Sequence, residues 1–193
     1  MKAAQKNRTR ELRTIAIVQA RMRSSRLPGK VLLDITGEPM LVRVVERVRR
    51  ASTVDGVVVA TTVDPTDDAV EALCKAQGFS FYRGSVHDVL DRYYQAAHRF
   101  RAEVVVRITA DCPVIDPEVI DQTVNALLGG SFDFAANRLP PPWKRTYPIG
   151  LDVEVCTFQA LERAWKEAGE LHQREHVMPY LYEQEDRFRV RVV

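Results

Sequence analysis

Basic and hydroxyl side chains are concentrated in one short segment of this chain, and their chemistry suits phosphate binding. The segment QARMRSSRLPGK, at residues 19–30, contains these side chains: Arg21, Arg23, Ser24, Ser25, Arg26 and Lys30. Guanidinium and ammonium groups bind phosphate oxygens, while hydroxyl and backbone N–H groups supply further donors. Cations this close together repel one another unless an anion lies among them. The segment is therefore typical of a polyphosphate-binding loop.

The sequence around this loop favours phosphate binding over the alternative, a solvated basic loop. The run TIAIV at residues 14–18 is apolar and β-branched, and it predicts a strand directly before the loop. A strand that ends in a basic, glycine-containing loop is typical of phosphate binding at the carboxyl edge of an α/β sheet. Neither common nucleotide signature is present, because Val31 follows Lys30 and no G-x-G-x-x-G occurs. A P-loop kinase and a standard dinucleotide enzyme are therefore disfavoured.

A carboxylate, Asp111, lies just after the apolar run VVVRIT at residues 104–109, which predicts a buried strand. Ligand sites in open α/β sheets lie at this end of the strands. A carboxylate there, in a turn restricted by Pro113, is suited to holding Mg²⁺ against phosphate oxygens. From the residues alone, an ordinary turn or helix-capping aspartate is an equal alternative.

Three further charged residues lie in apolar surroundings. Arg107 is inside the run VVVRIT, where an arginine needs an anionic partner or a site to point into, so we expect it to point toward the substrate or Asp111. Asp152 and Glu154 are two residues apart in LDVEVCT, and strand alternation places them on the same face. They are expected to coordinate a metal or bind sugar hydroxyls, with a solvated strand face as the alternative.

Apolar runs alternate with helical patterns along the chain, and these elements must position the polar residues. Strands are expected over four further segments, at residues 57–60, 79–82, 104–109 and 132–137. Helices are expected to begin near Pro39, Asp64, Gly84 and Asp116. Residues 61–64 are expected to form the loop that follows the strand at 57–60. The alternation predicts an α/β fold with a mostly parallel central sheet flanked by helices.

The last third of the chain begins with an irregular segment. Residues 138–150 contain four prolines and are expected to form a lid or binding loop. Residues 151–157 alternate as a strand, helices are expected at 158–168 and 172–184, and a last strand is expected at 188–193.

Length and composition limit the class of protein. A chain of 193 residues, 46% hydrophobic and 28% charged, is typical of one globular domain, which we place at residues 14–193 after a disordered basic tail at residues 1–13. A net charge of +2 does not indicate nucleic-acid binding. The absence of a membrane-length apolar run or signal-peptide core predicts no membrane association. Three widely spaced cysteines form no zinc pattern and indicate a reducing compartment, the cytoplasm.

The segments QARMRSSRLPGKVL and GEPMLVRVVERV resemble the opening of the CMP-sugar cytidylyltransferases of the acylneuraminate and KDO type. The resemblance is strongest to the branch of spore coat polysaccharide biosynthesis protein F. It implies a Rossmann-like nucleotide-diphospho-sugar transferase (GT-A-like) fold. It also implies transfer of CMP from CTP to an acidic sugar, with release of pyrophosphate, for surface polysaccharide biosynthesis. Mg²⁺ is the implied cofactor, and a homodimer is the implied assembly.

The same resemblance implies roles for individual residues. The nucleotide-binding residues would be Gln19, Ala20, Arg21, Ser24, Arg26, Lys30, Thr61 and Arg83. The substrate-binding residues would be Ser85, Asp88, Arg92, Arg107, Asp152, Glu154 and His176. ADCP resembles the family's metal-binding motif, which implies Asp111 as a metal ligand, with Asp152 as a candidate second ligand; Arg21, Lys30 and Asp111 would be the catalytic residues. Read without the resemblance, Ser85 and Asp88 are helix-start residues, and Arg92 and His176 are helix-surface residues.

The chain departs from the family at its end, where relatives continue into a segment that in several members carries a second metal-binding aspartate. We therefore expect a truncated sequence, metal binding by Asp152 or Glu154, or weak catalysis. Two other classes stay open. A nucleotide-sugar-dependent glycosyltransferase usually has Asp-x-Asp where this chain has Ala110-Asp111-Cys112-Pro113, and a non-catalytic nucleotide-binding module would bind CTP without turnover.

Overall fold

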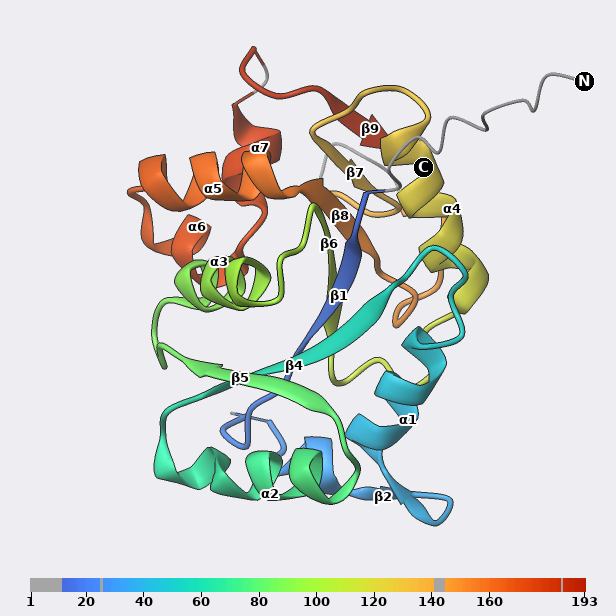
Figure 1. Ribbon diagram of the computed structural model, residues 1–193, viewed down its shortest axis with the longest axis vertical. Helices are drawn as coiled ribbons and strands as arrows, with labels where there is room; N and C mark the ends of the chain where they lie inside the picture. The colour runs from blue at the N-terminus through green and yellow to red at the C-terminus, as the bar shows by residue number, and fades with distance from the viewer. Residues whose placement is uncertain (1–11, 25, 141–144, 185) are drawn as a thin grey trace, which may run out of the picture.

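A twisted seven-stranded sheet forms the centre of the computed structural model, which describes residues 12–24, 26–140, 145–184 and 186–193 (Figure 1). In the described part of the chain, its strands are β1 (Thr14–Gln19), β4 (Gly56–Thr62), β5 (Ser80–Gly84), β6 (Val104–Thr109), β7 (Phe134–Ala136), β8 (Glu154–Thr157) and β9 (Val190–Val192). They are arranged in the order β5-β4-β1-β6-β8-β7-β9. The first four are mutually parallel, β8 runs antiparallel to β6 and β7, and β7 is parallel to β9. The mostly parallel sheet predicted from the sequence is confirmed.

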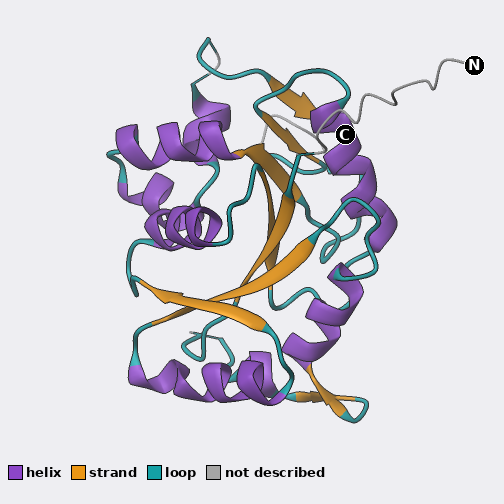
Figure 2. Ribbon diagram, viewed as in Figure 1, coloured by secondary structure: helices purple, strands orange, loops and turns teal. Residues whose placement is uncertain are grey.

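Helices cover both faces of this sheet (Figure 2). The described helices are α1 (Met40–Val48), α2 (Asp68–Ala76), α3 (Val89–Arg99), α4 (Pro117–Leu128), α5 (Phe158–Glu167), α6 (Leu171–His176) and α7 (Pro179–Glu183). Two 3-10 turns, η1 (Lys30–Leu32) and η2 (Pro65–Asp67), and a small hairpin of β2 (Asp34–Ile35) and β3 (Glu38–Pro39) complete the described elements. Residues of α1, α2 and α4 form one hydrophobic cluster, and residues of α3, α5 and α7 form the other.

The strands read as continuous apolar runs because the sheet is buried on both faces. In β1, Ala16 and Val18 belong to the cluster with α1, α2 and α4. Ile15 and Ile17 belong to the opposite cluster. Alternate side chains therefore pack on opposite faces, and both faces are lined with apolar atoms. This burial fixes the direction in which the strand ends leave the sheet.

Four predicted boundaries are wrong. Thr61 and Thr62, expected in a loop, belong to β4, because Thr61 pairs with Arg83 and Thr62 with Gly84 of β5. Gly84 and Ser85 do not open the following helix: Gly84 ends β5, and α3 begins at Val89 after the N-cap Asp88.

The third wrong boundary concerns the carboxyl-terminal helix expected over residues 172–184. The structure divides this segment into α6 and α7, because Val177 has a left-handed φ of 75° and Pro179 begins a new helix. Farther upstream, the strand expected at 151–157 begins only at Glu154, so Asp152 lies before it.

Several predictions fall on residues outside the described ranges. The tail expected at residues 1–13 is described only at Leu12 and Arg13, and Arg13 accepts the backbone N–H groups of Glu103 and Val104 through its carbonyl. The Pro-rich segment at 138–150 is described without residues 141–144. Among the described residues, no helix is long and apolar enough to cross a membrane. The domain limits stay a prediction.

At the amino-terminal edge of the sheet, Asp121 of α4 holds the turn that follows α1. Its carboxylate accepts hydrogen bonds from the backbone N–H and hydroxyl groups of Ser52 and Thr53, at 2.7–3.0 Å. Burial alone would raise the pKa of Asp121, but these hydrogen bonds outweigh it and lower that pKa. The folded state therefore binds the proton less tightly than the unfolded chain does.

We expect Asp121→Asn to lower the free energy of unfolding by about 1–2 kcal/mol at pH 7. Because the pKa of Asp121 is lowered on folding, its contribution is complete above the unfolded pKa of about 3.9 and is lost as the pH falls through the folded value. Urea unfolding of both proteins at a series of pH values should show the difference narrowing below about pH 4. A difference that does not change with pH would contradict this assignment.

Candidate active site

The basic loop and the turn at Asp111 leave the sheet at the same edge. Their strands, β1 and β6, are neighbours, with Gln19 opposite Thr109, and the N–H of Ala110 donates to the carbonyl of Gln19 at 3.0 Å. Parallel neighbours end on one side of a sheet, so residues 20–30 and 110–113 meet there. The ammonium of Lys30 contacts the carboxylate of Asp111, with Nζ 2.5 Å from Oδ2.

A cavity of about 250 Å³ opens between these two segments. Its charged and polar lining residues are Gln19, Arg21, Arg23, Ser24, Arg26, Lys30, Arg107, Thr109, Asp111, Glu175 and His176. Val31, Val89 and Ala110 complete the wall. The structure thus brings together eight residues expected to bind nucleotide, substrate or metal: Gln19, Arg21, Ser24, Arg26, Lys30, Arg107, Asp111 and His176.

Glycine and proline give the loop its shape. Gly29 has a left-handed φ of 72°, a backbone conformation that favours glycine, and it directly precedes Lys30 at the start of η1. The N–H of Gly29 donates to the carbonyl of Met22 at 2.8 Å and closes the loop on itself. This closure turns the side chain of Lys30 toward Asp111.

Asp111 is ionised at neutral pH. Burial would raise its pKa, but hydrogen bonds from Lys30 and from the Thr109 hydroxyl outweigh this effect and lower the pKa of Asp111. The two charged side chains keep contact with solvent, since Lys30 is 23% and Asp111 40% exposed. A charged ligand entering the cavity can therefore reach both.

The donor set fits a magnesium ion that is shared with phosphate. Asp111 offers a hard oxygen ligand in the cavity, and Mg²⁺ in such sites is usually held by one or two carboxylates plus substrate phosphates. Within the described residues, no group of three or more His, Cys, Asp or Glu side chains is arranged to hold a metal. The protein alone thus provides an incomplete coordination shell.

Asp152, the candidate second metal ligand, forms a bidentate ion pair with Arg145, at 2.7 and 3.1 Å. Asp152 lies near the turn that contains Asp111, because the negative charges of both residues act on Cys112. Burial has the largest effect and raises the pKa of Cys112, these two charges raise it further, and the hydrogen bond with the Thr109 hydroxyl lowers it. To coordinate a metal, Asp152 would have to exchange Arg145 for it. Its role stays a prediction.

Two residues expected to bind the nucleotide do not line this cavity. Thr61 lies inside β4 with its side chain fully buried, away from the cavity lining. Arg83 donates to Glu71 at 2.5 Å and pairs with Asp68 at 2.7 Å, both on α2, and it also donates to the carbonyls of Thr62 and Asp64. Arg83 therefore ties α2 to the end of β4.

Ser85, Asp88 and Arg92 form a scaffold at the start of α3 and do not line the cavity. Asp88 caps α3 by accepting the N–H of Asp91 at 2.8 Å, and its own N–H donates to the Ser85 hydroxyl at 3.0 Å. Arg92 is fully buried, not a surface residue, and donates to the Ser85 carbonyl at 2.5 Å. Substrate binding by these residues stays a prediction.

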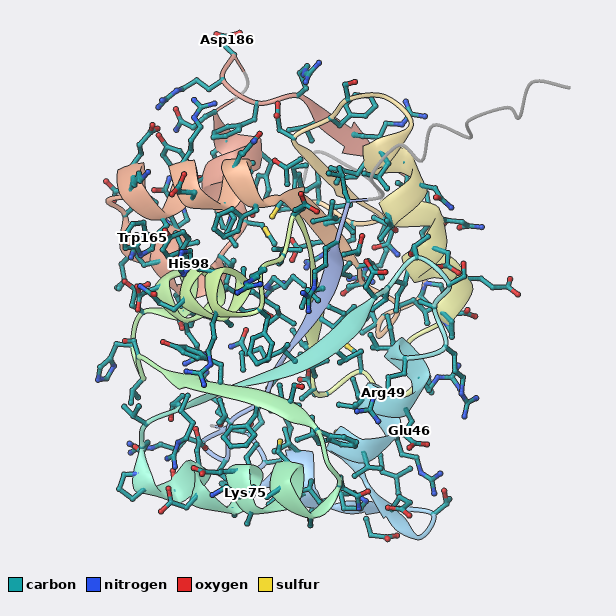
Figure 3. The ribbon with its side chains drawn as sticks, in the orientation of Figure 1. Glu46, Arg49, Lys75, His98, Trp165 and Asp186 are labelled. Atoms are coloured by element: carbon teal, nitrogen blue, oxygen red, sulfur yellow. The ribbon has the colours of Figure 1, made fainter. Side chains whose placement is uncertain are left out.

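Arg174 connects this scaffold to the cavity. Its guanidinium contacts the carboxylate of Asp88 at 2.5 and 3.0 Å, and it donates to the carbonyl of Trp165, which lies beside α3 (Figure 3). These contacts hold α6 in place, so that the next residues, Glu175 and His176, reach the cavity wall. Sequence reasoning missed this role of Arg174, although it named the nearby His176 as a candidate substrate-binding residue.

Arg107 lines the cavity and is neutralised from the neighbouring strand. It lies opposite Glu154 in the β6–β8 ladder, and the two side chains form an ion pair. Burial would lower the pKa of Arg107, but the charge of Glu154 outweighs it and raises that pKa. In the described part of the chain, Nε of Arg107 is buried without a hydrogen-bond partner. The guanidinium of Arg107 is therefore paired with Glu154, while its Nε–H has no hydrogen-bond acceptor.

We expect Glu154→Gln to lower the free energy of unfolding by about 2–3 kcal/mol, because it leaves a largely buried guanidinium without its counter-charge. The side chains of Arg107 and Glu154 are only 19% and 17% exposed. Glu162→Gln removes a more exposed pair with Lys166 and should cost less than about 1 kcal/mol. Urea unfolding measures both, and equal losses in the two variants would contradict a special role for the buried pair.

The fold is the Rossmann-like fold of nucleotidyltransferases. CMP:2-keto-3-deoxy-manno-octonic acid synthetase, solved in complex with CTP, superposes with a TM-score of 0.72 at 20% identity, covering 94% of this chain and 89% of that one. A cytidylyltransferase from Leptospira borgpetersenii superposes with a TM-score of 0.86 at 34% identity, covering 94% and 76%.

The chain belongs to the cytidylyltransferase family, whose model matches residues 15–193. An uncharacterized protein of Methanocaldococcus jannaschii is 42% identical, covering 93% of this chain and 71% of that protein. Spore coat polysaccharide biosynthesis protein SpsF of Bacillus subtilis is 36% identical, covering 86% and 71%. A 3-deoxy-manno-octulosonate cytidylyltransferase of Anaeromyxobacter dehalogenans is 40% identical over 117 residues, which are 60% of this chain and 47% of that enzyme.

Proposed function

We propose that this protein transfers CMP from CTP to an acidic sugar, releases pyrophosphate, and serves surface polysaccharide biosynthesis. One observation carries the proposal: Lys30 and Asp111 meet in a cavity lined by arginines at the carboxyl edge of the sheet. The names of two relatives, a 3-deoxy-manno-octulosonate cytidylyltransferase and a spore coat polysaccharide protein, support the acidic sugar and the polysaccharide role.

In this reaction a sugar hydroxyl oxygen attacks the α-phosphorus of CTP. A new P–O bond forms, the bond to the oxygen that bridges the α- and β-phosphates breaks, and pyrophosphate leaves with the electron pair while the hydroxyl proton passes to water. Arg21, Arg26 and Lys30 stabilise the negative charge on the phosphate oxygens. Bound at Asp111, Mg²⁺ would add positive charge at the same oxygens. The chain's own task is therefore to position the triphosphate and to neutralise it.

A second cavity, beside the first, could accommodate the nucleoside part of CTP. It has a volume of about 800 Å³, lies against the same loop and shares Arg21, Arg23 and Ser24 with the first cavity, and Val86 and His87 form part of its wall. We place the cytidine part of CTP there and the triphosphate beside Lys30. The sugar then occupies the end of the first cavity lined by Arg107, Glu175 and His176, where Arg107 and His176 are suited to a carboxylate.

The proposal also includes Mg²⁺ as the metal, a homodimer and a cytoplasmic location. Light scattering tests the assembly, and activity with a series of divalent ions tests the metal. The glycosyltransferase alternative is disfavoured by the family match and by the single aspartate of ADCP.

Incubation with CTP, Mg²⁺ and a panel of sugars, while pyrophosphate is followed, tests the function. Release that depends on a keto-acid sugar supports the proposal. Release of a nucleoside diphosphate from a nucleotide sugar would support a glycosyltransferase instead. Tight CTP binding without turnover on any sugar would support a non-catalytic module and overturn the proposed reaction.

A further inference from the structure

A buried carboxylate lies directly behind the basic loop, in a part of the chain to which no role has been assigned so far. Asp67, the last residue of η2, is only 1% exposed. Its Oδ1 accepts the N–H of Met22 at 2.7 Å, and its Oδ2 accepts the N–H and hydroxyl of Thr62 at 3.1 and 2.5 Å. Burying a carboxylate is costly unless such donors surround it, so these contacts fix the group firmly.

Met22 is the residue through which the loop is held. Its N–H donates to Asp67, and its carbonyl accepts the N–H of Gly29 at 2.8 Å, which joins the two ends of the loop. Its side chain lies against Gly29, where an added Cβ would be 3.4 Å from Cε of Met22. The residues on either side of it, Arg21 and Arg23, both line the cavity beside Lys30. The hydrogen bonds of Met22 therefore fix the backbone positions of Arg21 and Arg23, from which the two guanidinium groups extend into the cavity lining.

The anchor runs from the loop to the neighbouring strand. Thr62 ends β4, and two residues earlier in β4 the carbonyl of Ala60 accepts the N–H of Ala20 at 3.1 Å. The chain is thus tied to β4 twice within three residues, at Ala20 by the backbone and at Met22 through Asp67.

We infer that Asp67 is a positioning residue that holds the basic loop in the conformation needed to bind the triphosphate. This inference rests on the proposed function, because it takes the loop to be the phosphate site. Asp67 does not line the cavity, so it acts through Met22 and not by touching the ligand. The ligand that depends on it is a polyphosphate chain, whatever base or acceptor is attached.

A side chain that accepts hydrogen bonds at both oxygens suits this position. Two backbone N–H groups and one hydroxyl point at Asp67, and an ionised carboxylate accepts at both oxygens. Asparagine has the same shape but carries one oxygen and one NH₂ group. Its NH₂ group would have to face an N–H donor, either that of Met22 or that of Thr62. Either arrangement leaves a buried N–H facing an NH₂ group, so Asp67→Asn should weaken the anchor of the loop without removing any atom from the cavity wall.

Calorimetric titration with inorganic tripolyphosphate tests the inference, because this probe needs neither base recognition nor turnover. We expect Asp67→Asn to bind tripolyphosphate roughly ten- to a hundredfold more weakly than wild type, the range of a lost charged hydrogen bond. Asp121→Asn is the matched control: it makes the same change at a carboxylate that also accepts two backbone N–H groups and two hydroxyls, but at the opposite edge of the sheet. Both variants should lose stability, and only Asp67→Asn should lose affinity.

The outcomes separate this inference from the proposed function. Equal tripolyphosphate affinity in the two folded variants would overturn the role of Asp67 and leave the proposed function standing. A wild-type protein that does not bind tripolyphosphate would overturn both. If Asp67→Asn does not fold, hydrogen exchange of the Met22 amide in the wild-type protein tests whether Asp67 holds the loop. Exchange of the Met22 amide as slow as that of β4 amides supports the inference, and exchange at the rate of an exposed loop overturns it.

Discussion

Asp111→Asn is expected to lower the turnover number for pyrophosphate release by roughly a thousandfold or more, because the variant loses the carboxylate that we propose holds the metal against the phosphates. The substitution keeps the shape of the side chain, and Asp111 is 40% exposed, so the fold should stay intact. Initial rates at saturating CTP and sugar, together with thermal unfolding, measure both effects.

A matched control for this prediction lies five residues farther along the chain. Asp116 caps α4 by accepting the N–H of Glu118 at 2.8 Å, and asparagine is an equally good N-cap. Asp116→Asn should therefore keep both stability and turnover. Near-normal turnover in Asp111→Asn would show that the metal assignment is wrong.

Lys30→Met is expected to lower kcat/KM for CTP by roughly a hundredfold or more, because it removes the ammonium that lines the cavity beside Asp111 and keeps the length of the side chain. The loss should be greatest at low ionic strength, where charge attraction is least screened. Measuring kcat/KM and CTP affinity between low and high salt should show a weaker salt dependence in the variant than in wild type.

Lys75→Met controls for the loss of one positive charge from the molecule. Lys75 lies on α2, is 64% exposed and pairs with Glu71, outside the cavity lining. It should leave CTP affinity and its salt dependence unchanged. Unchanged CTP affinity in Lys30→Met would remove this lysine from the site.

The parts of the fold that were predicted correctly depend on local signals. Residues 104–109 form β6 as predicted, because an apolar, β-branched run ends there at a proline-containing turn. The extension of β4 through Thr62 depends on pairing with β5, which lies about 20 residues farther along the chain. The residues of β4 alone do not indicate this pairing. The division between α6 and α7 was detectable, since Pro179 lay inside the expected helix.

Some features of the candidate site could also be predicted from local sequence, and others depend on how distant elements pack. The meeting of the basic loop with Asp111 follows from the rule that parallel neighbours end at one edge, so sequence reasoning could anticipate it. The partners of Arg83 and the burial of Arg92 depend on how α2 and α3 pack, and neither is visible in a helix-start pattern. Asp67 lies in the helix start expected near Asp64, and its contact with Met22 could not be predicted from the sequence because it spans 45 residues.

A crystal structure with CTP and Mn²⁺, in which the anomalous signal locates the ion, tests the central claim most directly. We expect the ion to lie between the Asp111 carboxylate and the triphosphate, with the Lys30 ammonium moved from Asp111 to a phosphate oxygen. A triphosphate bound elsewhere, while Lys30 and Asp111 stay paired and no ion touches Asp111, would contradict the proposed site.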